Sequence, residues 1–169
     1  MKICVICVGN ELMLDDGLGI EVYRQMEAAY ELPAEIDLVS AGCMTLDMIE
    51  RVNAYDLIIS VDAIDGTGAE AGTIFRYTPD DVARRGTPMG SLHELKLADL
   101  FDAAELLGYS ADGLCFGMRV LNMAPVEFAP YLTPVVEARV PFFAECVVAA
   151  LVQAGHEVLN ADGSPVTPG

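Results

Sequence analysis

The apolar positions in the amino-terminal part of the chain change period twice, and each change predicts a new secondary-structure element. The chain opens on an apolar run from Lys2 to Val8, which is typical of a buried strand. From Gly17 to Tyr30 the apolar residues recur at helical spacing, so this segment predicts an amphipathic helix that Leu32-Pro33 ends. Ile36 to Ser40 predicts a second strand.

The middle of the chain continues this alternation of helices and strands. Thr45 to Asn53 predicts a short helix, and Asp56 to Val61 is apolar enough for a central strand in a sheet covered on both faces. Thr73 to Tyr77 predicts a fourth strand. The link before it is shorter than the roughly dozen residues of a parallel crossover, so we expect the fourth strand to run antiparallel to the third.

After a long loop, the remaining chain predicts one helix before and further helices after a fifth strand. The first helix carries its apolar residues between Leu97 and Leu107 on one side and ends at a glycine. Leu114 to Val120 predicts the fifth strand. Pro134 and Pro141 can each begin a helix, and the helix from Phe142 to Ala154 closes the fold.

This order of elements predicts a three-layer α/β fold. We expect a five-stranded, mostly parallel twisted sheet with one antiparallel strand and with helices on both faces. Residues 1–155 form a single domain in this interpretation. Residues 156–169 are polar and rich in glycine and proline, which is typical of a flexible carboxyl-terminal tail.

The charge balance excludes several classes of partner. The chain of 169 residues has 26 acidic and 9 basic residues and a formal net charge of −17. This argues against nucleic acid, because phosphate contacts need lysine and arginine, and it favours cations or a basic partner. The late apolar stretch from Val140 to Ala154 is interrupted by Glu145 and too short to cross a bilayer, so we expect no membrane insertion.

The five cysteines are scattered, and only Cys4 and Cys7 form a C-x-x-C motif. Because these two lie three residues apart in a predicted strand, their side chains point to opposite faces and do not share one metal ion. We interpret both as core residues. Reduced thiols of this kind indicate the cytoplasm.

An acidic loop, "GNELMLDDG", follows the first predicted strand at a position where many α/β proteins bind phosphate. We interpret Asp15 as the N-cap of the following helix. Asp16 follows it, and Asp62 comes directly after the third strand. Because ligands of open α/β sheets collect at the carboxyl ends of the strands, Asp16 and Asp62 are candidate functional residues.

His93 is the third candidate, because it opens a predicted helix with Ser91 as a possible cap. The positive end of the helix dipole favours the neutral imidazole, which is the form that binds metal. Two carboxylates and one imidazole suit a divalent ion such as nickel, zinc or manganese.

Four stretches of the chain resemble the maturation endopeptidases of nickel-containing hydrogenases. They are "CVGNELMLDDGLGIEV", "DLIISVDAIDGTGAEAGTIFRY", "GSLHELKLADLF" and "APYLTPVVEARVP", and the match extends from Met1 to about residue 154. The loop that joins a glycine-asparagine pair to an acidic pair is specific, and its combination with V-D-A-I-D and S-L-H is more so.

The resemblance implies a soluble protease that removes a short carboxyl-terminal extension from the hydrogenase large-subunit precursor after nickel insertion. The family's metal-contacting positions fall on Asp16, Asp62 and His93. Asp16 and Asp62 are also the candidate catalytic residues, and their carboxylates either activate water or hold the substrate's nickel. Members often have glutamate where this chain has Asp16, whose reach is one methylene shorter. Nickel arrives with the substrate, and zinc or cadmium are further ions expected to fit. The resemblance does not identify the hydrogenase, the scissile bond or the oligomeric state.

Two other functions stay open at this point. A metal-binding or metal-delivery module would use the same ligands without hydrolysis. A phosphoacceptor receiver domain also has an acidic pair after its first strand and an aspartate after its third. It additionally needs a lysine after its fifth strand, and this chain has no lysine beyond Lys96.

Overall fold

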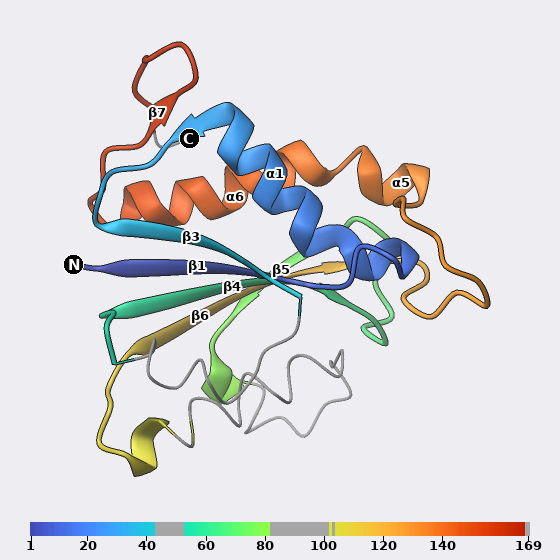
Figure 1. Cartoon of the computed structure of the whole chain (residues 1–169), viewed down its shortest axis with the longest axis horizontal. Coiled ribbons are helices and arrows are strands. Elements are labelled where there is room, and N and C mark those ends of the chain that lie inside the picture. The colour runs from blue at the N-terminus through green and yellow to red at the C-terminus, as the bar shows by residue number, and fades with distance from the viewer. Residues whose placement is uncertain (43–52, 82–101, 103, 168–169) are drawn as a thin grey trace.

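Among the described residues of the computed structural model (1–42, 53–81, 102 and 104–167), five strands form one sheet in the order β3-β1-β4-β6-β5 (Figure 1). All neighbours pair in parallel except β5, which is antiparallel to β6. The predicted sheet, mostly parallel with one antiparallel strand, is therefore confirmed. The elements of the sheet are β1 (Ile3–Val8), β3 (Ile36–Ala41), β4 (Leu57–Ile64), β5 (Ile74–Tyr77) and β6 (Asp112–Arg119).

One face of the sheet is covered by the two long described helices, α1 (Leu18–Ala29) and α6 (Val140–Gln153) (Figure 1). Alternate residues of β1 and β4, among them Val5 and Ile59, pack against these helices in the larger core. The opposite alternation builds a second, smaller core that contains Ile6 and Ile58 and is closed in part by Ala104. Both faces of β1 and β4 are therefore buried, which explains why these strands read as continuous apolar runs.

Helix α1 begins at Leu18 because the residues before it form a tighter 3₁₀ turn, η1 (Leu14–Gly17). It ends at Ala29, where the chain extends into the short strand β2 (Tyr30–Glu31) before the predicted stop at Leu32-Pro33. The short helix α5 (Pro134–Glu137) and helix α6 both begin at or next to a proline, as predicted.

The third strand is longer than the sequence predicts. Strand β4 continues to Ile64, because β6 accompanies it as far as the pair Ile64–Arg119. Asp62 therefore lies within the strand and not directly after it. The fourth strand does run against the direction of the third, but its neighbour is β6, at the edge of the sheet.

The segment beyond residue 155 makes contacts with the domain. It contains β7 (Leu159–Asn160), which pairs antiparallel with β2, and its Val158 belongs to the larger core. The flexibility expected of residues 156–169 stays a prediction. Several expected features lie outside the described residues: His93, Ser91, Cys43, and most of the helices 45–53 and 97–107.

The C-x-x-C interpretation is confirmed. Cys7 packs in the larger core under α1, and Cys4 packs in the smaller core on the other face. Both cysteines are buried and outside any disulfide, and burial, with Cys4 nearby, raises the pKa of Cys7 to about 12. The thiol of Cys7 is therefore neutral in the folded protein, which suits packing and not metal binding.

Candidate active site

The order of strands creates one point where the chain changes direction across the sheet. From β1 the chain moves to β3 on one side and then returns to β4 on the other side of β1. Connections leave the carboxyl ends of β1 and β4 in different directions, and a crevice between them is the usual ligand site of such folds. The acidic loop starts at the end of β1, and η1 within that loop packs against β4.

The acidic loop folds back tightly onto the end of β1. The amide of Asn10 donates to the carbonyl of Asp16 at 3.1 Å, and a Cβ on Gly9, whose φ is +153°, would stand 2.1 Å from that same oxygen. A Cβ on Gly19, in the first turn of α1, would stand 2.0 Å from the carbonyl oxygen of Val8. Both glycines are therefore required by close backbone approach, and together they bring Asp16 next to the end of the strand.

The N-cap interpretation of Asp15 is wrong, because its side chain caps neither η1 nor α1. Asp15 is fully buried, and its carboxylate accepts hydrogen bonds from the backbone amides of Leu121, Asn122 and Thr133 at 2.7–3.1 Å. The Thr133 hydroxyl also donates to it at 2.9 Å. Asp15 therefore joins the acidic loop to the segment that follows β6. Its partners are 106 to 118 residues away in sequence, so no local pattern predicts this role.

The same two segments are joined by backbone contacts. Leu14 adopts φ +54°, an unusual value for a side chain of this size, and its amide donates to the carbonyl of Ala129 at 2.8 Å. The amide of Ala129 donates in turn to the carbonyl of Leu12 at 2.9 Å. A strained residue persists only where its surroundings fix it, and such residues gather at functional sites. The turn that carries Asp16 is thus held by the end of β1 on one side and by the segment around Ala129 on the other.

Asp16 and Asp62 both lie buried at the carboxyl edge of adjacent strands. Asp16 is 8% exposed in η1, and Asp62 is 5% exposed near the end of β4. The pairing of β1 with β4 ends at Cys7–Val61, so Asp62 is the next position beyond it. One oxygen of Asp62 accepts from the amide of Ala63 at 2.8 Å. Both carboxylates therefore lie at the edge of the sheet where ligands of open α/β folds bind.

The third expected ligand, His93, lies outside the described residues. Among the described parts of the chain, no three histidine, cysteine, aspartate or glutamate side chains are grouped so as to hold a metal ion. The metal-binding roles of Asp16, Asp62 and His93 therefore stay a prediction.

Comparison with known proteins identifies the family. Residues 20–150 match the family described as hydrogenase maturation protease. The chain belongs to this family. Its members are peptidases, and the maturation they perform is the carboxyl-terminal processing of the hydrogenase large subunit. The protease identity favours the predicted endopeptidase over a receiver domain or a metal-delivery module.

Individual relatives agree with this assignment. The chain is 29% identical to the hydrogenase 2 maturation protease of Escherichia coli over 94% of its own length and 96% of the relative's. It is 30% identical to the hydrogenase expression/formation protein HupD of Rhodobacter capsulatus, over 99% and 76% of the two chains. The solved structure of the hydrogenase maturating endopeptidase HybD from E. coli superposes with a TM-score of 0.82 at 29% identity, covering 97% of this chain and 100% of that one. The fold class expected from the sequence is thus the fold of this maturation protease.

No helix among the described residues is both long and apolar enough to cross a bilayer.

Proposed function

We propose that this maturation protease cleaves the large-subunit precursor of a nickel-containing hydrogenase after nickel has been inserted, with Asp16, Asp62 and His93 contacting that nickel. The nickel is part of the substrate, and zinc or cadmium would occupy the same ligands in its absence. We also propose that the reaction takes place in the cytoplasm, because the described cysteines are not in disulfides.

The observation that carries the proposal is the pair of buried carboxylates at the switch point of the sheet. Asp16 is fixed by a turn that Gly9, Asn10 and Asp15 hold in place, and Asp62 by β4, which pairs with β6 at this position and with β1 up to Val61. Side chains on rigid elements can be held in the geometry that a metal or a reacting bond needs. In a chain with net charge −17, nickel(II) is also a ligand that the overall potential attracts.

Two roles are open to these carboxylates. As nickel ligands, they would position the precursor so that one peptide bond lies at the site. As a general base, one of them would accept a proton from the attacking water as its oxygen bonds to the carbonyl carbon. The proton then passes to the leaving nitrogen as the carbon–nitrogen bond breaks, so the atoms and charges balance.

The experiment compares wild type with Asp16→Asn, Asp62→Asn and His93→Ala on nickel-loaded and metal-free precursor. The measurements are the dissociation constant for the precursor and the single-turnover rate of release of the carboxyl-terminal peptide. A nickel ligand shows weaker binding of the loaded precursor only. A general base shows unchanged binding with a lower single-turnover rate.

Efficient cutting of metal-free precursor by the wild type would overturn nickel recognition. A metal-delivery function would instead be shown by transfer of nickel between the two proteins without any released peptide.

A further inference from the structure

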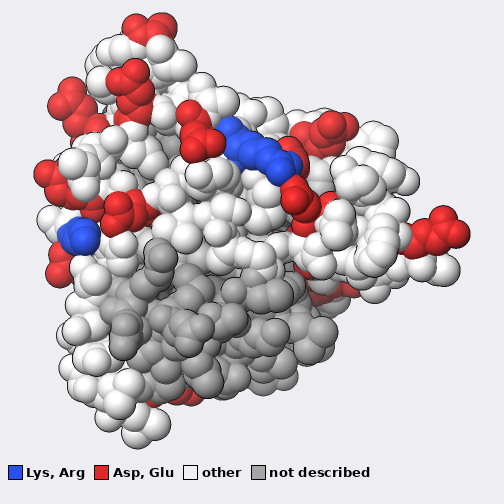
Figure 2. Space-filling view, viewed as in Figure 1, with Lys and Arg blue, Asp and Glu red and all other residues white. Residues whose placement is uncertain are grey.

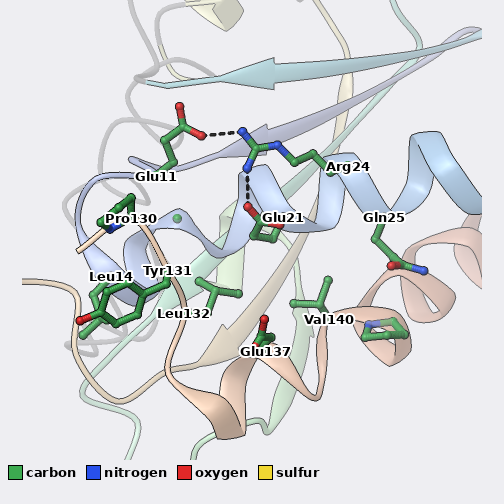
Figure 3. A pocket seen from close by; sticks show the side chains of 12 residues that line it. Glu11, Leu14, Glu21, Arg24, Gln25, Pro130, Tyr131, Leu132, Glu137 and Val140 are labelled. Atoms are coloured by element: carbon green, nitrogen blue, oxygen red, sulfur yellow. Dashed lines mark hydrogen bonds and ion pairs between the residues drawn. The ribbon is translucent and has the colours of Figure 1, made fainter. Parts of the chain in front are cut away.

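A cavity of about 460 Å³ lies beside the acidic loop (Figure 3). Glu11, Leu14 and Gly17 of that loop form one of its walls. Its other walls come from α1 and from the segment that leads into α6. Gly17 follows Asp16 directly, so the cavity and the candidate active site share the turn η1. A chain seated in the cavity would therefore lie next to the turn that carries Asp16.

The cavity combines an apolar floor with an acidic rim. Leu132 and Val140 are nearly buried at its base, and Glu11, Glu21 and Glu137 surround it. Among the described residues that line it, Arg24 is the one basic residue, and its guanidinium lies between Glu11, at 2.6 Å, and Glu21 (Figure 3). Because Arg24 pairs with Glu11 and Glu21, no ion-pair partner is described for the carboxylate of Glu137. The lining therefore suits a long basic side chain, which buries its methylenes and presents its charge to carboxylates.

The segment next to the cavity presents large apolar side chains to solvent. Phe128 is 78% exposed and Tyr131, which lines the cavity, is 67% exposed, and Val126 and Leu121 are also exposed. Soluble proteins rarely expose so many large apolar residues in one segment unless it binds a partner. Aromatic residues such as these two are enriched at the energetic centres of interfaces.

This apolar segment is held in a fixed position by the contacts of the acidic loop. Asp15 binds the amides of Leu121 and Asn122 at one end and Thr133 at the other, and Ala129 is bound between them by the backbone of Leu12 and Leu14. A loop fixed at three places loses little conformational freedom when a partner binds. The exposed aromatic residues are thus presented in advance and in one orientation.

Charge complementarity indicates the chemistry of the partner. On the face shown in Figure 2 the basic side chains lie beside acidic ones, and further acidic side chains lie over the upper part of this face. An acidic surface of this kind repels a second copy of the chain and attracts a basic segment.

We infer that the cavity and the exposed residues Val126, Phe128 and Tyr131 form a docking surface for a basic, apolar-flanked segment of the large-subunit precursor. The inference rests on the proposed function and adds to it a second contact, outside the carboxylate site. This contact selects the precursor by its surface, while Asp16 and Asp62 act at the nickel and the scissile bond.

The test uses the full-length protein and nickel-loaded large-subunit precursor. Glu137→Lys reverses the exposed charge of the cavity, and Phe128→Ser removes the exposed aromatic ring. Matched controls are Glu157→Lys and Leu106→Ser, which change an exposed glutamate and an exposed leucine outside this surface. The readouts are the dissociation constant at low and high salt and the single-turnover cleavage rate, with circular dichroism to confirm the fold.

We expect Glu137→Lys and Phe128→Ser each to weaken precursor binding about tenfold, with the cleavage rate of the bound precursor within about twofold of wild type. The loss in Glu137→Lys shrinks at high salt, whereas the loss in Phe128→Ser persists. Unchanged affinity in both variants, or a lower single-turnover rate at unchanged affinity, overturns the inference. A wild-type dimer in sedimentation that Phe128→Ser dissociates also overturns it, because the occupant is then a second copy. A wild type that binds the precursor through this surface but releases no peptide contradicts only the proposed function.

Discussion

Strand β1 carries buried thiols along its length and leads into buried carboxylates beyond its end, and the two sets of polar groups serve different purposes. Cys4 and Cys7 are covered by a layer on either face of the sheet, and Cys7, with its pKa near 12, is neutral. Asp15 and Asp16 are also buried, but they lie in a loop, and backbone amides of the segment after β6 donate to the carboxylate of Asp15. The interior of the sheet thus accepts weakly polar groups for packing, whereas its carboxyl edge can hold charge and admit a ligand.

The largest expected effect is a loss of precursor cleavage, and we expect it for Asp16 and Asp62 but for no other polar group of these two regions. Asp16→Asn or Asp62→Asn keeps the shape of the side chain but removes the charge that binds a cation or accepts a proton. We expect the rate of precursor cleavage to fall by about a hundredfold or more with an unchanged circular dichroism spectrum. Asp65→Asn, a half-exposed aspartate of the same V-D-A-I-D motif, is the control and should keep the wild-type rate. Near-normal cleavage by either Asn variant would place the chemistry elsewhere.

The second prediction distinguishes Asp15 from its neighbour Asp16. In the wild type, backbone N–H groups donate to both carboxylate oxygens of Asp15. In Asp15→Asn the side-chain NH2 group replaces one of these oxygens, so two hydrogen-bond donors face each other. We expect a loss of about 3 kcal/mol in the free energy of unfolding. Because each kcal/mol lowers Tm by about 2–4 °C in a domain of this size, Tm should fall by about 10 °C in a thermal melt. Thr133→Ser keeps the hydroxyl and serves as the control; a stable Asp15→Asn variant would contradict the anchoring role.

The third prediction concerns the buried thiol of Cys7 and its pH dependence. Folding raises the pKa of this thiol from 9.0 to about 12, so the folded state resists losing the proton that the unfolded state releases. The stability that this provides is fully present below pH 9 and is lost as pH rises toward 12. The slope reaches about 1.4 kcal/mol per pH unit.

Cys7→Val should remove that part of the alkaline loss, measured as the difference between urea unfolding curves of the two proteins from pH 8 to 11. Identical pH profiles for both proteins would show that Cys7 is not the titrating group. Cys146, which is only partly buried, provides the comparison variant Cys146→Val, with a smaller difference.

The smallest effect is expected for Cys4→Ser, which exchanges a thiol in the smaller core for a hydroxyl. A cost of about 1 kcal/mol in unfolding free energy and an unchanged cleavage rate follow from a packing role. Loss of cleavage in a well-folded Cys4→Ser or Cys7→Ser protein would assign the C-x-x-C motif a part in the reaction.

Much of the architecture could be predicted because burial leaves a periodic record in the sequence. The opposite orientation of Cys4 and Cys7 follows from strand alternation alone, and the helix from Leu18 follows from apolar residues at helical spacing. The candidate pair Asp16 and Asp62 could be found because both follow or end apolar strands, where a carboxylate has no local reason to be.

The sequence by itself therefore determined the five strands of the main sheet, the helices that become α1 and α6, the burial of both faces of β1 and β4, and the two carboxylates to test. Tertiary structure alone decided that β5 lies beside β6, that β4 continues through Asp62, and that Asp15 holds the loop after β6 instead of capping a helix. The physical reason is range. Periodicity arises within a single element, whereas strand neighbours and the partners of a buried carboxylate are chosen by packing between segments far apart in the sequence, by 106 to 118 residues for the partners of Asp15.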